Sequence, residues 1–128
     1  MEKIIINTKK EKELVDITDK VNEIIKKNDF KEGAVTLFLT HTTAALTTID
    51  EDPGIDLDLF DALEEMVPKL KYRHPHNPSN VPSHILSSLI GTSLTLLVEG
   101  GELILGTWQR VVLIELDGPK EREIYISI

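Results

Sequence analysis

The chain has 128 residues, of which 41% are hydrophobic and 28% charged, a composition typical of one globular domain. Its formal net charge of −8 disfavours general nucleic-acid binding, because an acidic surface repels phosphate backbones. The absence of cysteine excludes disulfides, thiolate metal sites and cysteine nucleophiles. No apolar run approaches the ~20 residues of a membrane-spanning helix, and the first residues do not resemble a signal peptide. The sequence therefore predicts a cytoplasmic protein without a membrane partner.

The first forty residues predict strands around one helix. Residues 3–7 and 13–17 read as strands, separated by a polar turn at 9–12. A helix is expected from Thr18 to Lys27, with Thr18 as its N-cap and Asp19 complementing the helix dipole. Its apolar face would comprise Val21, Ile24 and Ile25. The nearly uncharged run opened by Gly33 is typical of a buried strand, and it ends at His41.

The middle of the chain predicts two further helices. One is expected over residues 56–67 and is terminated by Pro68. Its buried side would comprise Leu59, Phe60, Leu63, Met66 and Val67. After an ordered loop at 71–81, Pro82 suits the first turn of a short helix that stops at Gly91. Its inward-facing residues would be Ile85, Leu86 and Leu89.

The last third predicts only strands and turns. Strands are expected at 93–98, 102–105, 110–116 and 123–128, with tight turns at 99–101 and 117–119. Strands at the ends and helices in the middle indicate an α+β fold with a mainly antiparallel sheet and about three helices. Residues 1–128 are expected to form a single domain, and no Gly-rich phosphate fingerprint is present.

Four histidines are the first candidates for chemistry: His41, His74, His76 and His84. Neutral imidazole is the commonest metal ligand in a chain without cysteine, and catalytic zinc commonly takes three protein ligands. Spacing alone does not bring these residues together, because no pair has the i, i+4 spacing of the zinc proteases. The alternative is that some are loop histidines with ordinary hydrogen bonds, and His76, between prolines, is the first candidate for that role.

Polar residues beside these histidines offer further chemistry. Thr42 and its neighbouring threonines place hydroxyls beside His41, either to bind a ligand oxyanion or simply as β-branched residues at a strand end. Glu51 and Asp58 lie in an acidic stretch. Either could be a general base or orient a histidine, although carboxylates also complement a helix N-terminus. The spacing does not match an EF-hand loop.

The segment 106–109, Gly-Thr-Trp-Gln, contains the only tryptophan. A bulge between two strands could turn Trp108 or Gln109 toward a pocket. Trp108 could equally belong to the core or to a subunit interface, whereas Gln109 is harder to assign to a core. A serine hydrolase is weakly supported, because no serine lies in a Gly-x-Ser-x-Gly turn.

Taken together, these motifs resemble the YjbQ-like family. The resemblance rests on His-Thr-Thr-Ala-Ala-Leu at 41–46, Tyr-Arg-His at 72–74, the segment from Asn80 to His84, Gly91, and Gly-Thr-Trp-Gln at 106–109. The strongest match is the run 93–111, and the similarity covers nearly the whole chain.

The resemblance implies an α+β domain that assembles as a homotrimer. It also implies a site built around histidines that binds a divalent metal, expected to be zinc. The family histidines correspond to His41, His74 and His84, and His76 lies outside the pattern. Glu51, Asp58 and Arg73 would serve catalysis. Substrate binding would fall to Thr42, Asn80, Trp108 and Gln109.

The resemblance also implies a function. Family members are often labelled secondary thiamine-phosphate synthases, which would couple a pyrimidine pyrophosphate to a thiazole phosphate. The cations near the motifs are Arg73 and Arg110, a small set for a pyrophosphate site. A three-histidine metal site would also suit water activation in a metal-dependent hydrolase. We therefore expect a metal-dependent enzyme acting on a small phosphorylated metabolite. The alternatives are a trimer that only binds a metabolite or metal, and histidines that only satisfy hydrogen bonds at a trimer interface.

Overall fold

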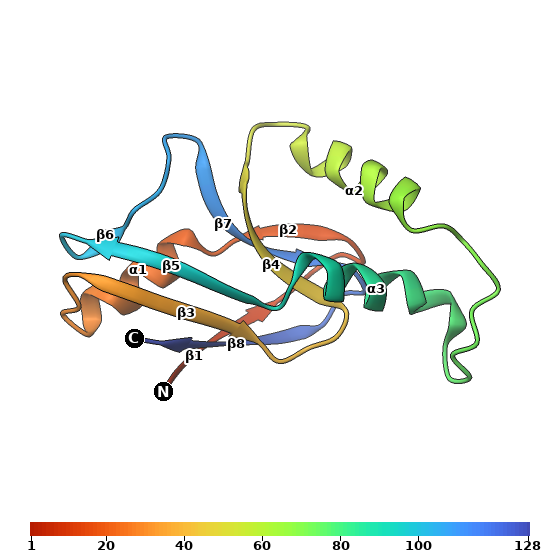
Figure 1. Cartoon of the computed structure of the whole chain (residues 1–128), viewed down its shortest axis with the longest axis horizontal. Helices are drawn as coiled ribbons and strands as arrows, with labels where there is room; N and C mark the ends of the chain where they lie inside the picture. Colours follow the sequence, from red (N-terminus) through yellow and green to blue (C-terminus); the bar gives the residue numbers. More distant parts are fainter.

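The computed structural model describes residues 1–128, which form eight strands, three α-helices and one 3-10 turn (Figure 1). The strands are β1 (Glu2–Asn7), β2 (Glu13–Asp16), β3 (Gly33–Leu39), β4 (Ala44–Asp50), β5 (Ser93–Glu99), β6 (Glu102–Leu103), β7 (Gln109–Glu115) and β8 (Glu121–Ser127). The helices are α1 (Thr18–Lys27), α2 (Ile55–Met66) and α3 (Val81–Ile90), and the 3-10 turn η1 spans Pro78–Asn80.

The strands form two antiparallel sheets. One has five strands in the order β1-β8-β3-β5-β6, and the other has three in the order β2-β7-β4. Helices α2 and α3 lie toward one end of the molecule, where residues between α2 and η1 project as a long loop (Figure 1). The predicted α+β class, with an antiparallel sheet core and three helices, is confirmed.

Strand β7 lies between two hydrophobic cores. Its residues from Val111 to Ile114 are all buried, although successive side chains of a strand point to opposite faces. Val111 and Leu113 pack into the core between the two sheets and α1, whereas Val112 and Ile114 pack against α2 and α3. The apolar run in the sequence therefore follows from burial on both faces.

A buried ion pair joins β7 to β8. Arg122 and Glu115 are 2% and 0% exposed, and Arg122 Nε donates to Glu115 Oε1 at 2.8 Å. Arg122 also donates to the carbonyl and the hydroxyl of Thr43, at 3.1 and 2.9 Å. Hydrogen bonds from Arg122 and Thr8 outweigh burial, so the pKa of Glu115 is lowered. The pair fixes the chain where it enters β4.

Several sequence predictions for the elements are wrong in detail. Strand β4 was not predicted, because Thr and Asp dilute its apolar pattern. Met66 and Leu89, expected to be buried, are 68% and 69% exposed. Thr18 does not cap α1: its own backbone N–H donates to Asp16 Oδ1 at 2.9 Å, and its hydroxyl accepts from the backbone N–H of Val111. No helix is long and apolar enough to cross a membrane.

Candidate functional site

The predicted site residues lie at two ends of strand β4. His41 and Thr42 come just before it and Glu51 just after it. Because β4 has seven residues, at about 3.3 Å each, the two groups are separated by about 20 Å. Trp108 and Gln109 lie at the Glu51 end, since Gln109 pairs with Asp50 in the ladder. One chain therefore does not gather all the predicted residues around one point.

At the Glu51 end, two carboxyl groups and a guanidinium form what we call the acid centre: Asp16, Glu51 and Arg110. Arg110 Nε donates to Asp16 Oδ2 at 2.7 Å, and its Nη2 to Asp19 Oδ1 at 3.3 Å. Asp16 thereby bridges Arg110 and the first turn of α1, where it accepts from the backbone N–H of Thr18. Asp16 is not among the residues predicted from the sequence, because its position just before a helix is typical of ordinary helix capping.

The environment drives the pKa values of the two carboxyls apart. Partial desolvation of its carboxyl and the neighbouring carboxylate of Asp16 raise the pKa of Glu51 to about 7, although the residue as a whole is exposed. Burial also disfavours the charged form of Asp16, but hydrogen bonds from Arg110 and Thr18 outweigh it and lower the pKa of Asp16 to about 2. Glu51 is thus half-protonated near neutral pH beside an ionised partner. Such a split is typical of carboxyl pairs that perform acid–base chemistry.

Trp108, in the turn before β7, and Gln109, the first residue of β7, stand beside the acid centre. Gln109 Nε2 donates to Thr48 Oγ1 at 2.9 Å, and Gln109 Oε1 accepts from the backbone N–H of Gly106 at 3.0 Å. These two bonds fix the amide and hold the turn together. The Trp108 ring is 71% exposed, so it belongs to no core within the chain. The open hollow here is lined by residues 48–50 and 106–109.

At the other end, His74 and His84 form what we call the histidine centre. Their ring centroids are 5.8 Å apart and the rings meet edge to face. His84 lies on α3 and is half-buried, whereas His74 lies on the projecting loop and is exposed. The ring of His76 also meets that of His74 edge to face, with a centroid distance of 5.8 Å. Arg73, beside them, is exposed and forms no ion pair, so its guanidinium is free to bind an anion.

His41 has a different environment. Its Nε2 accepts a hydrogen bond from the backbone N–H of Glu123 at 2.9 Å, so the ring has its proton on Nδ1. Burial and the charge of Arg122 lower the pKa of His41, which is therefore neutral at pH 7. His41 and Thr42 line a shallow hollow with Ser87, Ser88 and Gly91 at the end of α3.

The titration of His41 gives a first testable prediction. Protonation removes the lone pair that accepts from Glu123, so His41 should titrate below the ordinary histidine value of 6.5. The folded state binds this proton less tightly than the unfolded state. The neutral ring of His41 therefore stabilises the fold, and this stabilisation should be lost as the pH falls below 6.5. A carbon–proton NMR titration of the four imidazoles measures it, and His41→Gln assigns the resonance. A midpoint for His41 at or above 6.5 would contradict the hydrogen bond.

The three-histidine metal set that the resemblance implies does not fit within one chain. No group of three or more His, Asp and Glu side chains is arranged to hold a metal ion. A neutral imidazole has one free lone pair, and that of His41 is engaged by Glu123. The edge-to-face pair of His74 and His84 is compatible with two ligands of one ion, so a further protein donor would have to come from outside the chain.

The two remaining predicted residues are engaged elsewhere or exposed, although Asn80 lies only one helical turn before His84. Asp58 is exposed in the first turn of α2, where its charge complements the helix dipole, and its carboxylate forms no ion pair. Asn80 lies between η1 and α3, and its Nδ2 donates to Asp117 Oδ2 at 3.3 Å.

Comparison with known proteins identifies the family. Residues 2–128 match the model of the family described as UPF0047 protein YjbQ-like. The chain belongs to this family. UPF0047 relatives include MJ1081 of Methanocaldococcus jannaschii, 38% identical over 96% of this chain and 89% of its own length. Another is YugU of Bacillus subtilis, 36% identical over 96% of this chain and 94% of its own length.

Solved structures of the UPF0047 family have the same fold. A conserved protein of the YjbQ/UPF0047 family from Clostridium acetobutylicum superposes with a TM-score of 0.90 at 31% identity, covering 100% of this chain and 99% of its own. A YbjQ-like protein of unknown function from Sulfolobus solfataricus also gives a TM-score of 0.90, at 33% identity over 98% of this chain and 92% of its own. The predicted resemblance is thus confirmed, and the names of these relatives assign no reaction.

Proposed function

We propose that this UPF0047 protein is a metal-dependent enzyme that acts on a small phosphorylated metabolite. We further propose that it works as a homotrimer in which each site combines the acid centre of one copy with the histidine centre of the next. The observation that carries the proposal is the carboxyl pair of Asp16 and Glu51. A glutamic acid with a pKa of about 7 beside an ionised aspartate is suited to proton transfer at physiological pH.

The distance between the two centres supports a shared site. Glu51 follows the last residue of β4, whereas His84 lies on α3, which is bonded through Ser87 to Ala44 at the start of β4. The length of β4, about 20 Å, therefore separates the acid centre from this part of α3, and a small substrate does not reach both within a monomer. Head-to-tail contact in a closed ring would bring the acid centre of each copy to the histidine centre of its neighbour. Both ends also expose large apolar side chains, which subunit contacts commonly bury: Ile104 and Trp108 at one end, Met66, Leu70 and Leu89 at the other.

The chemistry of each side chain suggests its role in the proposed reaction. Glu51 would give a proton to the leaving oxygen or take one from the nucleophile, while Asp16 and Arg110 hold its carboxyl in place. Trp108 offers an exposed face for a ring of the substrate, and the immobilised amide of Gln109 would orient it. On the neighbouring copy, Arg73 would bind phosphate, with the Nδ1–H of His41 and the hydroxyl of Thr42 as further donors.

The metal would be held by His74 and His84, with at least one further donor from the neighbouring copy. A divalent cation there would neutralise charge on a phosphate or a departing pyrophosphate. Thiamine-phosphate synthesis, the reaction implied by the resemblance, has this requirement and is the first reaction to assay. Zinc is the expected metal because the donors are imidazoles.

Elemental analysis of untagged protein tests the metal part of the proposal. We expect about one zinc per chain, lost in His84→Ala and His74→Ala. His76→Ala is the matched control and should keep the metal, because His76 lies outside the family pattern of histidines, although its ring is as close to His74 as that of His84. Chelation of the metal should abolish turnover of a pyrimidine pyrophosphate with a thiazole phosphate. Zinc that persists in His84→Ala, or protein that stays metal-free after loading, would contradict the assignment. Stoichiometric zinc without turnover would instead favour a binding protein.

A further inference from the structure

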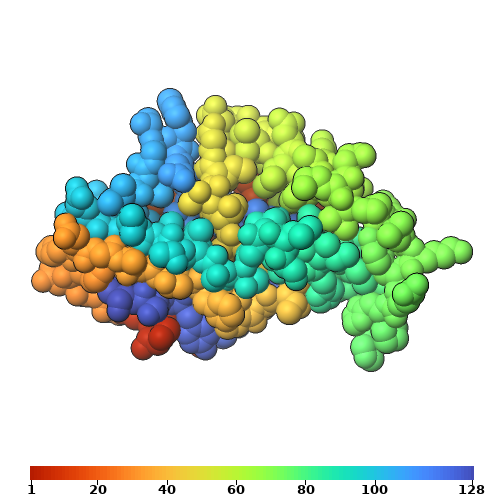
Figure 2. Space-filling model, in the orientation of Figure 1, coloured from red at the N-terminus to blue at the C-terminus, as the bar shows by residue number.

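Strand β1 forms an open border of the five-stranded sheet. It pairs with β8 on one side, in a register that runs from Glu2 opposite Ile126 to Asn7 opposite Glu121, and no strand lies on its other side. In the space-filling view, the start of the chain, in red, lies at the lower border of the molecule (Figure 2). A strand edge with unpaired backbone groups is a template on which another strand can pair.

The backbone of Ile5 points out of this edge. Ile5 lies opposite Glu123 in the ladder. The backbone N–H of Glu123 donates to His41 Nε2, and its carbonyl accepts from the N–H of Thr40, so both groups turn away from β1. Opposite residues of an antiparallel ladder exchange either both hydrogen bonds or neither, so the N–H and C=O of Ile5 also face away from β8. Lys3 and Asn7, two positions to either side, have the same orientation.

The edge of β1 lacks the protection that other edges of the two sheets have. At the opposite border of the same sheet, β6 has only two residues. The edge of β4 is engaged, since the N–H of Leu46 donates to the carbonyl of Gly91 and the carbonyl of Ala44 accepts from Ser87. Strand β1 has six residues, contains no proline and pairs without a bulge. Its central isoleucines, residues 4–6, strongly favour strand pairing.

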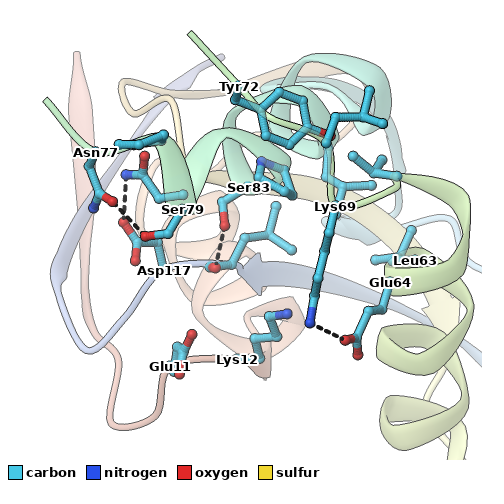
Figure 3. A pocket seen from close by; sticks show the side chains of 17 residues that line it. Glu11, Lys12, Leu63, Glu64, Lys69, Tyr72, Asn77, Ser79, Ser83 and Asp117 are labelled. Atoms are coloured by element: carbon cyan, nitrogen blue, oxygen red, sulfur yellow. Dashed lines mark hydrogen bonds and ion pairs between the residues drawn. The ribbon is translucent and has the colours of Figure 1, made fainter. Parts of the chain in front are cut away.

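This edge is also distinct from the largest cavity of the chain. The cavity has a volume of about 620 Å³ and lies between the end of α2, the projecting loop, the start of α3 and the turns β1–β2 and β7–β8 (Figure 3). Glu11 and Lys12, in the turn after β1, line it, but no residue of β1 does. A strand that pairs with β1 would therefore bind a surface of its own.

The residue pattern of the edge fits a second copy of the same strand. An antiparallel pair with its two-fold axis at Ile5 places Ile5 opposite Ile5 of the partner subunit, and Lys3 opposite Asn7 of the partner subunit. The outward N–H and C=O groups of the two strands would form about six hydrogen bonds. On the outer face, the two Ile5 side chains, each 40% exposed in the single chain, would cover one another.

Charge favours a copy at this edge over contact elsewhere. The chain has a net charge of −8, so most of its surface repels a second copy. Strand β1 has no net charge, because it contains Glu2 and Lys3, and Glu2 is already held by Lys27 at 3.4 Å. In the pair, Lys3 would face the partner's Asn7, and Glu121 of the partner subunit lies one strand further on the same face. No like charges would lie directly opposite each other.

We propose that two copies of the chain pair β1 to β1 around Ile5 and join their five-stranded sheets into one continuous sheet. The contact uses a surface separate from the acid centre and the histidine centre, and it does not depend on the ring proposed above. Combined with a ring of three, a two-fold contact of this kind gives a hexamer of two stacked rings.

The mass of the assembly tests the pairing, measured by light scattering during size-exclusion chromatography at about 0.1 mM chain. Ile5→Pro removes an N–H that points outward and leaves the hydrogen bonds to β8 in place. We expect it to halve the mass of the wild-type assembly, from hexamer to trimer with the ring and from dimer to monomer without it. Thr36→Lys is the control and should keep the wild-type mass, because Thr36 lies on β3, which is paired on both sides.

A cross-link gives a readout that does not depend on the folding of the proline variant. The chain has no cysteine, so Ile5→Cys introduces one thiol, and facing residues would lie about 5.5 Å apart between their Cα atoms. A short bismaleimide should yield covalent dimers of this variant, whereas Thr36→Cys, also exposed, should stay monomeric. Equal masses for wild type and a folded Ile5→Pro, or no covalent dimer of Ile5→Cys, would overturn the pairing. A wild-type trimer with either result would leave the proposed ring intact.

Discussion

Replacing Arg122 with methionine is expected to lower the free energy of unfolding by about 4 kcal/mol, because Glu115 would be left as an uncompensated buried charge. Glu115 is 0% exposed and lies between two hydrophobic cores, so water does not reach it to replace the guanidinium. The entry to β4 would also lose the two hydrogen bonds from Arg122 to Thr43. Urea denaturation at pH 7 measures the loss.

Two further variants isolate the cause. The double variant Arg122→Met, Glu115→Leu removes both charges and should recover most of the stability, since an apolar pair of similar volume commonly replaces a buried ion pair without loss. Arg110→Met breaks ion pairs that are partly exposed and should cost about 1 kcal/mol or less. Equal losses for Arg122→Met and Arg110→Met would contradict the importance of burial.

Glu51→Gln is expected to have the largest effect on activity. If Glu51 carries the proton, the variant should lose about 100- to 10,000-fold in rate, the contribution typical of general acid–base catalysis. The wild-type pH profile should have a limb near pH 7, where the Glu51 carboxyl titrates, and the variant should lack it. Glu65→Gln, an exposed glutamate on α2 outside the acid centre, is the control and should behave as wild type.

A stability measurement tests the same residue without an assay. The pKa of Glu51 is raised from 4.5 to about 7, so between these values the folded protein holds a proton that the unfolded chain releases. Stability should therefore fall as pH rises from about 4.5 to about 7, and Glu51→Gln should remove this fall. Because Glu51 is exposed, we expect a change of about 1 kcal/mol or less. Identical pH profiles for the two proteins would contradict the raised pKa.

The lowered pKa of Asp16 has the opposite effect on stability to the raised pKa of Glu51, because it makes the protein less stable as the pH falls. Its ionised form contributes stability above about 3.8, and this contribution should be lost as pH falls from 3.8 toward 2. The loss should persist in Glu51→Gln, since Arg110 and Thr18 still hold the Asp16 carboxylate.

The elements that the sequence predicted well are those with strong local signals. Helix α1 has the predicted bounds, because its apolar spacing and terminal charges agree with each other. Strand β4 escaped prediction because its burial depends on a neighbouring strand and a helix that are distant in the sequence. Ser87 on α3, for example, donates to the carbonyl of Ala44 at 2.7 Å. Met66 and Leu89 read as core residues, since nothing local separates a buried apolar side chain from one left exposed.

The sequence predicts candidate site residues but not how they are arranged in space. Motif resemblance selected Glu51, His74 and His84, yet the direction of β4 decides that Glu51 lies far from the histidines. Asp16 was missed because its partner Arg110 is 94 positions away. The role of His41 also depends on a long-range contact, with Glu123. These relations follow from sheet register, which the sequence does not state directly.

The shared site is the central claim, and cross-linking tests it most directly. The chain has no cysteine, so Arg73→Cys and Thr107→Cys introduce unique thiols. Arg73 belongs to the loop after α2 and Thr107 to the turn between β6 and β7, and these two segments lie at opposite ends of the molecule (Figure 1). In the double variant, a short bismaleimide should join copies into covalent dimers and trimers on a denaturing gel, while each single variant should stay monomeric. A double variant that yields only monomer bands would contradict a site built from two copies.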